Sequence, residues 1–113
     1  MCTKNQAIGI LEEVYIACSS ILKEYIKDVY LYGSYARGDY SKESDVDILV
    51  TAALDRSELS KFRYDLASIS SDLSLKHSVT VSLTVKPYDD FMLYSSALPF
   101  YSNVIKEGIR YGA

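Results

Sequence analysis

The sequence predicts an α/β (α+β) fold in which a small mixed β-sheet of about three or four strands packs against helices. Two long segments, 4–25 and 56–76, repeat apolar residues at helical spacing. Three short segments, 29–32, 45–51 and 79–85, are instead rich in β-branched and aromatic residues, which favour strands. The two kinds of segment alternate along the chain, and that order is typical of a sheet covered by helices.

The first predicted helix, over 4–25, carries its apolar residues on one face, namely Leu11, Tyr15, Cys18, Leu22 and Tyr25. The strand that follows, over 29–32, stops at Gly33. The second strand, over 45–51, has apolar side chains on one face, those of Val46, Ile48 and Val50.

The second predicted helix, over 56–76, again has one apolar face, made of Leu59, Phe62, Leu66, Ile69 and Leu73. In the third strand, over 79–85, valine and leucine alternate with threonine and serine, which predicts one buried and one polar face. Pro87 is expected to end this strand. Two short helices are expected around 90–95 and 99–108, with Gly108 as a C-terminal stop.

Length, composition and charge limit the kind of protein. The chain has 113 residues and a mass of 12.7 kDa, so residues 1–113 are expected to form a single domain. Apolar residues make up 49% and charged residues 24%, the composition of a globular rather than a disordered protein. The net charge of −3 argues against a protein that holds nucleic acid through a broad basic surface, so no DNA template is expected.

Targeting and redox features favour a cytoplasmic protein. No apolar run approaches the roughly 18 residues that a membrane helix needs, so no membrane association is expected. The segment 1–6 lacks the basic stretch and apolar core of a signal peptide. Cys2 and Cys18 have no metal-binding or redox spacing, which favours two reduced cysteines.

Two carboxylates, Asp45 and Asp47, stand two residues apart on the second predicted strand, so both are expected on the same face. Like charges held side by side repel unless a cation or a proton lies between them. Such hard oxygen ligands suit Mg²⁺, which commonly takes one or two carboxylates and completes its shell with water and phosphate oxygens. The alternative is a solvated edge without a ligand, and the pair alone does not decide between the two.

A candidate phosphate-binding turn precedes this pair at Gly33 and Ser34. Gly33 ends a strand and Ser34 begins a helical turn, a geometry in which backbone N–H groups and a hydroxyl face outward and attract phosphate. Glycine has no side chain to keep a phosphate from the backbone, and Arg37 could add a charge-assisted contact. The alternative is a plain turn capped by serine. The sequence contains neither a P-loop nor a Gly-x-Gly-x-x-Gly motif.

Together, Gly33-Ser34, Arg37-Gly38 and Ser44-Asp45-Val46-Asp47 resemble the motif of nucleotidyltransferases of the DNA polymerase β superfamily, in particular the minimal nucleotidyltransferases of bacteria and archaea. The elements around the motif also follow the order of that family. The resemblance implies the nucleotidyltransferase (polymerase β palm-like) fold. It also implies that Gly33 and Ser34 bind the triphosphate and that Asp45 and Asp47 are catalytic and bind Mg²⁺ or Mn²⁺.

The activity that this resemblance implies is transfer of a nucleoside monophosphate from an NTP to an acceptor hydroxyl, with AMP from ATP as the expected group. A chain of this size has no second lobe to enclose the base and present the acceptor, which points to a protein partner. Related minimal nucleotidyltransferases are often encoded beside HEPN-domain proteins and act as antitoxins, some by adenylylating the toxin. The resemblance therefore implies a HEPN-type partner.

One position departs from the family pattern. Family members usually carry a third carboxylate on the strand after the pair, and the predicted strand 79–85 has none. Thr80 or Ser82 would occupy that place, with Ser82 favoured because it lies mid-strand; Asp89 and Asp90 are not expected to reach back. The third acid helps to hold the metal that activates the attacking hydroxyl. The alternative function is therefore a nucleotide-binding or protein-binding module that has lost the reaction.

Other polar and aromatic residues are expected to have structural rather than catalytic roles. His77, the only histidine, is expected at the surface or in a turn. Tyr35 and Tyr40 could stack on a base or face a partner, but such tyrosines more often cover a small core. Asp39 and Glu43 lie in a polar loop and are expected to be solvated.

Overall fold

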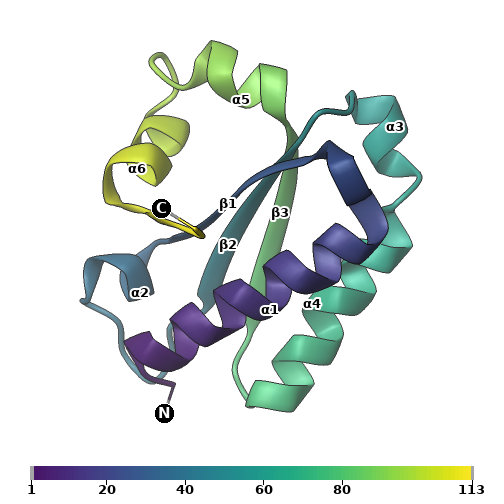
Figure 1. Cartoon of the computed structure of the whole chain (residues 1–113). Coiled ribbons are helices and arrows are strands. Elements are labelled where there is room, and N and C mark those ends of the chain that lie inside the picture. Colours follow the sequence, from purple (N-terminus) through teal and green to yellow (C-terminus); the bar gives the residue numbers. More distant parts are fainter. Residues whose placement is uncertain (1, 113) are drawn as a thin grey trace.

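In the computed structural model, which describes residues 2–112, four strands form one sheet in the order β3-β2-β1-β4 (Figure 1). The strands are β1 (Ile26–Tyr32), β2 (Val46–Ala52), β3 (Val81–Pro87) and β4 (Ile109–Arg110). β1 runs antiparallel to β2 and to β4, whereas β3 runs parallel to β2. The predicted small mixed sheet is therefore confirmed.

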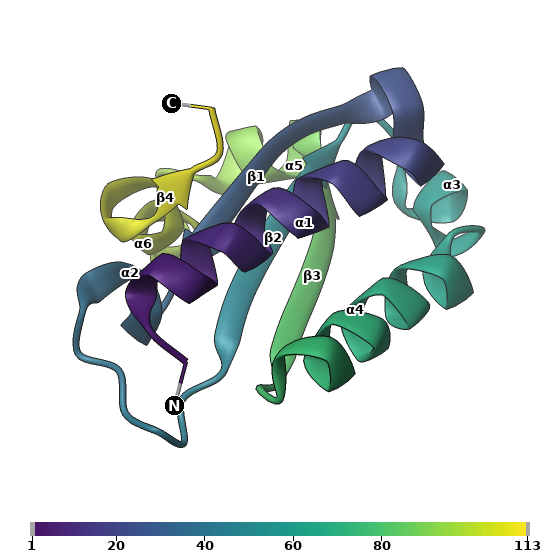
Figure 2. The same cartoon turned by 60° about the horizontal axis from the view of Figure 1, so that its bottom comes forward.

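Helices cover both faces of this sheet. They are α1 (Lys4–Leu22), the 3₁₀ turn η1 (Lys23–Tyr25), α2 (Ser34–Arg37), α3 (Arg56–Ser60), α4 (Arg63–His77), α5 (Tyr88–Tyr94) and α6 (Pro99–Glu107). The two longest, α1 and α4, lie side by side over one face, and α5 and α6 lie on the other (Figure 2). Of the described helices, none combines the length and the apolar character needed to cross a bilayer.

The main core lies between the sheet and the α1–α4 layer. Ile48 and Val50 of β2 are fully buried there against the apolar face of α1, which contributes Ile10 and Val14. A second, smaller core lies on the other face of the sheet, made of Tyr30, Leu49, Phe91 and Val104. Burial of a large apolar side chain stabilises a fold by roughly 1.5–3 kcal/mol, so both helix layers hold the sheet in place.

The segment predicted as one helix over 56–76 is in fact two helices, α3 and α4. Asp55 and Glu58 form a capping box that starts α3, and a turn at Lys61 and Phe62 separates it from α4. Lys61 keeps a right-handed helical backbone, whereas Phe62 does not. The apolar face predicted for a single helix still packs on the main core.

The strand boundaries also differ from the prediction. β1 begins at Ile26 rather than at residue 29, and β3 covers 81–87 rather than 79–85, although Val79 still packs against the core. β2 begins at Val46, so Asp45 lies just outside it. The pair Ile109–Arg110 forms β4 beside β1, and this strand was not predicted because two residues are too few to carry a period.

Candidate functional site

The turn at Gly33 joins the end of β1 to the short helix α2. Gly33 is the N-terminal cap of α2 and has a φ of 75°, a conformation that favours glycine. Its carbonyl accepts hydrogen bonds from the amides of Ala36 and Arg37, both 3.1 Å long. The structure thus has the predicted helical turn after Gly33, with a glycine and not a serine as its cap.

Ser34 is the first residue of α2, and its hydroxyl makes no capping hydrogen bond. Within residues 2–112, the backbone amides of Ser34 and Tyr35 also donate to no backbone acceptor, as is usual for the first residues of a helix. Ser34 is therefore not the cap that the alternative of a serine-capped turn required. A half-buried hydroxyl and two amides remain available at this turn for an acceptor such as a phosphate oxygen.

Asp47 lies directly beside this turn. In the sheet, Asp47 pairs with Tyr32 of β1, the residue that precedes Gly33. A Cβ atom placed on Gly33 would lie 2.5 Å from Oδ2 of Asp47, closer than any side chain can approach. The glycine therefore makes room for the carboxylate, a role that the sequence did not reveal.

Asp45 is exposed and precedes β2, so the prediction that both acids lie on one strand is wrong for Asp45. The two carboxylates are nevertheless close enough to interact. The pKa of Asp47 is raised above its ordinary value, first by burial and then by the negative charge of Asp45, while Arg37 acts in the opposite direction. An acid held next to another acid in a half-buried place favours a proton or a cation.

The two acids fit a divalent cation in their chemistry. Neither Asp45 nor Asp47 forms a hydrogen bond or an ion pair with any side chain of residues 2–112. Their oxygens are hard ligands, and Mg²⁺ commonly takes one or two carboxylates and fills its other positions with water and phosphate. No cluster of three or more acid, histidine or cysteine ligands occurs in this part of the chain, so protein atoms alone would leave such an ion incompletely coordinated.

A serine faces the acid pair on the strand where the family resemblance implies a third acid. β3 pairs in parallel with β2 so that Ser82 stands opposite Asp47, as predicted. Thr80 is exposed and precedes β3, with its carbonyl accepting from the Val46 amide at 2.9 Å. Asp89 lies in the first turn of α5, which follows the far end of β3.

Asp90, in the same turn, forms an ion pair with Arg56, with a separation of 3.4 Å. Both lie beside a hollow of about 590 Å³ that contains none of the predicted site residues. The prediction that Asp89 and Asp90 do not reach back to the site is thereby supported by the topology.

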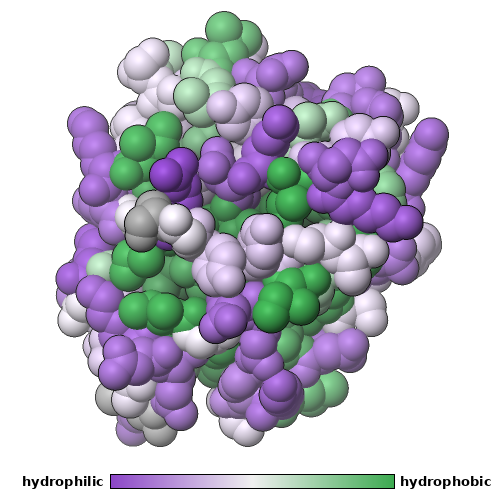
Figure 3. All heavy atoms as spheres, in the orientation of Figure 1, coloured by the Kyte–Doolittle hydropathy of each residue, from purple (hydrophilic) through white to green (hydrophobic). Residues whose placement is uncertain are grey.

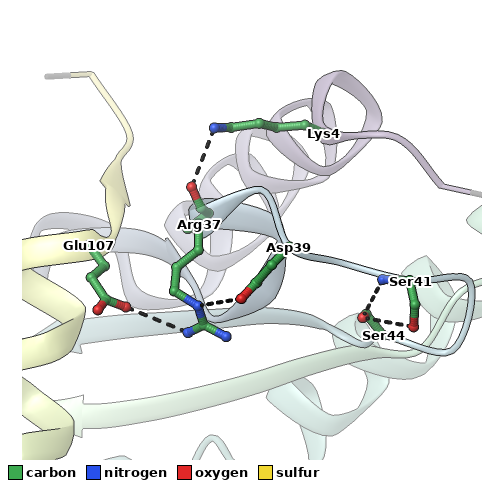
Figure 4. A network of polar contacts seen from close by, with 7 residues as sticks. Lys4, Arg37, Asp39, Ser41, Ser44 and Glu107 are labelled. Carbon is green, nitrogen blue, oxygen red and sulfur yellow. Dashed lines mark hydrogen bonds and ion pairs between the residues drawn. The ribbon is translucent and has the colours of Figure 1, made fainter.

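Arg37 connects the turn to the C-terminal helix. Its guanidinium lies 3.3 Å from the carboxylate of Asp39 and 3.5 Å from that of Glu107 in α6 (Figure 4). Asp39, predicted to be solvated, is exposed but also holds Arg37. Both carboxylates raise the pKa of Arg37, so it is a fixed positive charge beside the turn.

A pocket of about 220 Å³ opens next to Gly33 and Arg37, between α2 and α6. Its other walls include Tyr32 and Phe100, whose rings meet edge to face. The pKa of Tyr32 is raised, chiefly by burial and further by the charge of Asp47. The pocket and its aromatic walls were missed in the sequence, because they join segments that are distant along the chain.

The remaining candidates have structural roles. Tyr35 is buried and stacks on Tyr40 with the ring centres 4.4 Å apart, and its hydroxyl donates to the Cys2 carbonyl. The interpretation of these tyrosines as cover for the core is thus confirmed. His77 and the neighbouring Lys76 both contact the carboxylate of Glu13, which ties the end of α4 to α1.

Comparisons with known proteins agree with this geometry. The family model described as "Nucleotidyltransferase domain" matches residues 12–111. Two proteins of Methanocaldococcus jannaschii, each named "Putative protein adenylyltransferase", are clear relatives. One is 34% identical over 100 residues, which cover 87% of this chain and 90% of the relative. The other is 39% identical over 77 residues, which cover 68% of this chain and 76% of the relative.

Solved structures share the fold at low sequence identity. A "putative nucleotidyltransferase" from Sulfolobus solfataricus is 20% identical, with a TM-score of 0.61 over 96% of this chain and 81% of that one. A toxin–antitoxin complex crystallised with AMP-PNP contains a chain that is 21% identical, with a TM-score of 0.56 over 88% of this chain and 70% of that one. At these identities the likeness concerns the fold.

Proposed function

The chain belongs to the nucleotidyltransferase domain family, and on this premise we propose that it transfers AMP from ATP to a hydroxyl of a partner protein, with release of pyrophosphate, using Mg²⁺ or Mn²⁺. The observation that carries the proposal is the packing of Asp47 against Gly33. It brings an unpaired acid next to a turn with available amides, so a metal-binding group and a phosphate-binding group share one place.

Each residue of the site has a proposed task. The Ser34 hydroxyl and the first amides of α2 bind phosphate oxygens. Arg37 adds positive charge to the same phosphates, and Asp39 and Glu107 keep its guanidinium near the turn. Asp45 and Asp47 hold the divalent ion. When bound, such an ion neutralises phosphate charge and helps to activate an attacking hydroxyl.

The protein partner is supported by the relatives and by the surface. The relatives carry the name protein adenylyltransferase, and the solved neighbours include toxin–antitoxin complexes. Apolar side chains gather at the top of the molecule over α5 and the loop after it (Figure 3), where Leu93 is 69% exposed. Phe100 is also exposed and lines the pocket beside Gly33. We propose a HEPN-type protein as the partner, following the resemblance in the sequence.

Transfer of label tests the proposal. The chain is incubated with Mg²⁺ and ATP labelled at the α-phosphate, together with a HEPN-type protein as the candidate acceptor. Label is expected on the partner with the wild type and with Glu43→Gln, an exposed loop acid. It is expected to be lost with Asp47→Asn. Equal labelling by Asp47→Asn would contradict the proposed role of Asp47, and label from γ-labelled ATP would indicate phosphoryl transfer instead.

A second candidate function rests on Ser82. Because Ser82 stands opposite Asp47, where the family has an acid, the chain could bind ATP without transferring AMP. This binding module differs from the enzyme in one outcome. ATP would bind in a manner that depends on Asp47, and no label would reach any partner.

A further inference from the structure

The outer edge of β3 is open. Within residues 2–112, β3 is the last strand on its side of the sheet and pairs with β2 alone. In a parallel pair, successive residues direct their backbone groups alternately toward the neighbour and away from it. The Thr80 carbonyl accepts from Val46 of β2, so the even-numbered residues face β2 and the odd-numbered residues face outward.

Two serines of α4 occupy this edge at its first residue. The Val81 amide donates to the Ser74 hydroxyl at 2.8 Å, and the Ser70 hydroxyl donates to the Val81 carbonyl at 2.6 Å. The Ser74 hydroxyl in turn donates to the Ser70 carbonyl at 2.7 Å. The serines thus supply the donor and the acceptor that an adjacent strand would supply at Val81.

The next outward residues, Leu83 and Val85, have no such hydrogen bonds from side chains in residues 2–112. Among residues 2–112, no side chain bonds to their amides or carbonyls, and no backbone group outside the sheet does so. Pro87 ends the edge because it has no N–H to donate. The free edge is therefore short, from Ser82 to Lys86, which suits a peptide segment better than a whole sheet.

A groove runs along this free edge. It has a volume of about 570 Å³ between β3, α3 and α4, and its apolar walls are Leu59, Leu66, Ala67, Leu83 and Val85. A second hollow of about 320 Å³ adjoins it, shares Leu59 and Val85, and includes Lys86. The two hollows flank the edge, so a strand lying there would find room for side chains on both of its faces.

The unpaired charges at this edge are positive, because the two other charged residues of the second hollow, Arg56 and Asp90, form an ion pair with each other. Arg63 borders the groove and Lys86 borders the second hollow. Neither forms an ion pair with any carboxylate in the described part of the chain. A segment with aliphatic side chains on one face and acidic side chains on the other would complement the groove and Lys86.

From these observations we propose that the edge of β3 binds an extended segment of a partner protein as an additional strand. The segment alternates aliphatic residues, which fill the groove, with acidic residues near Lys86. The backbone amides and carbonyls of the segment form hydrogen bonds with those of Leu83 and Val85. These bonds are like the ones that the hydroxyls of Ser70 and Ser74 form with the backbone of Val81. Strand addition of this kind takes affinity from the main chain and specificity from pockets for alternate side chains.

The test selects binders from a displayed library of random seven-residue peptides, using the full chain. Selected peptides are expected to alternate aliphatic and acidic residues. Ala67→Arg, which fills the groove from an exposed position on α4, should weaken their binding at least tenfold. The matched control is Ser68→Arg, one residue further along α4 and also exposed, which should leave affinity within about twofold.

A second measurement leaves the protein unaltered. N-methylation of the peptide amides that face the edge should abolish binding, whereas methylation of the alternate amides should not. Hydrogen exchange at the amides of Leu83 and Val85 should slow at least tenfold when the peptide binds. Selection of no peptide sensitive to Ala67→Arg, or unchanged exchange at both amides, would overturn the proposal. A dimer of the chain that Ala67→Arg dissociates would assign the edge to a second copy and overturn it as well.

Discussion

The carboxylate of Asp47 lies against the backbone of Gly33, with Oδ2 only 2.5 Å from where a Cβ of residue 33 would be. The end of β1 and the start of β2 are thereby packed together at one point. Any side chain at residue 33 must displace the acid of Asp47, so the phosphate-binding turn and the acid are expected to respond together to substitution.

Gly33→Val and Ser34→Ala should therefore have different effects. Gly33→Val meets the Asp47 carboxylate and a φ of 75°, so we expect a loss of roughly 1–3 kcal/mol in stability and no measurable ATP binding. Ser34→Ala removes a hydroxyl that caps nothing, so stability should change by less than about 0.5 kcal/mol. Its ATP affinity should fall by about 1.5–3 kcal/mol, the value of a hydrogen bond to a charged group. Thermal unfolding and calorimetry measure both, and unchanged affinity in Ser34→Ala would remove the hydroxyl from the site.

Asp47→Asn should stabilise the metal-free protein at neutral pH. Because burial and Asp45 raise the pKa of Asp47 in the folded protein, its ionisation destabilises the fold as pH rises through that pKa. The asparagine variant should gain roughly 0.5 kcal/mol, or about 2–4 °C in Tm, at pH 7 in EDTA, and the gain should vanish near pH 3. Melting curves at the two pH values check this, with Glu43→Gln as the control. A difference in Tm that is the same at both pH values would contradict a raised pKa of Asp47 in the folded protein.

Ser82→Asp tests whether the site is a weakened enzyme. The new acid would stand opposite Asp47 and should raise AMP transfer, for which positioned proton transfer typically contributes about 10²–10⁴-fold, while ATP affinity stays within a few-fold. Without metal it should lower stability through repulsion, and Mg²⁺ should restore it. Thr80→Asp should have a smaller effect, because Thr80 is exposed and precedes β3. Ser68→Asp on α4 is the control. No gain in the rate of AMP transfer from Ser82→Asp or Thr80→Asp, with a verified partner as acceptor, would favour the binding module.

Glu13→Gln should destabilise the contact between α1 and α4. The hydrogen bond from Lys76 lowers the pKa of Glu13, with His77 acting in the same direction against the effect of burial. The stabilisation is therefore present at pH 7 and is lost as pH falls through the lowered pKa. A cost of about 0.5–1 kcal/mol is expected at pH 7 and none near pH 2. Glu12→Gln, an exposed neighbour, should leave the stability unchanged at both pH values. An equal effect of the two variants would exclude a specific role for Glu13.

The parts of the fold that depend on local periodicity could be predicted from the sequence. The alternation of valine with serine and threonine around Ser82 placed that residue on the polar face of β3. The helical faces were also predicted correctly except for Tyr25, which lies in η1 and is exposed because α1 ends at Leu22. The turn at Phe62 was missed. The apolar residues on both sides of that turn keep helical spacing in the sequence and pack on the same core, so the hydrophobic pattern contains no sign of the turn.

The parts that depend on distant contacts could not be predicted. Glu107 of α6 forms an ion pair with Arg37, which lies seventy residues earlier in the sequence. β4 pairs with β1 although it has only two residues. The reason for glycine at position 33 was only half visible in the sequence. The motif suggested close approach of a phosphate, and the contact with Asp47 depends on how β1 and β2 are paired.

The central claim is that Asp45 and Asp47 bind a metal–nucleotide complex at the Gly33 turn. Titration of ATP into the protein by calorimetry, with and without Mg²⁺, tests it most directly. We expect Mg²⁺ to strengthen binding to the wild type and to Glu43→Gln. Asp45→Asn and Asp47→Asn should each lose at least tenfold in affinity with Mg²⁺ present, which corresponds to about 1.4 kcal/mol. Unchanged affinity in both variants would contradict the claim.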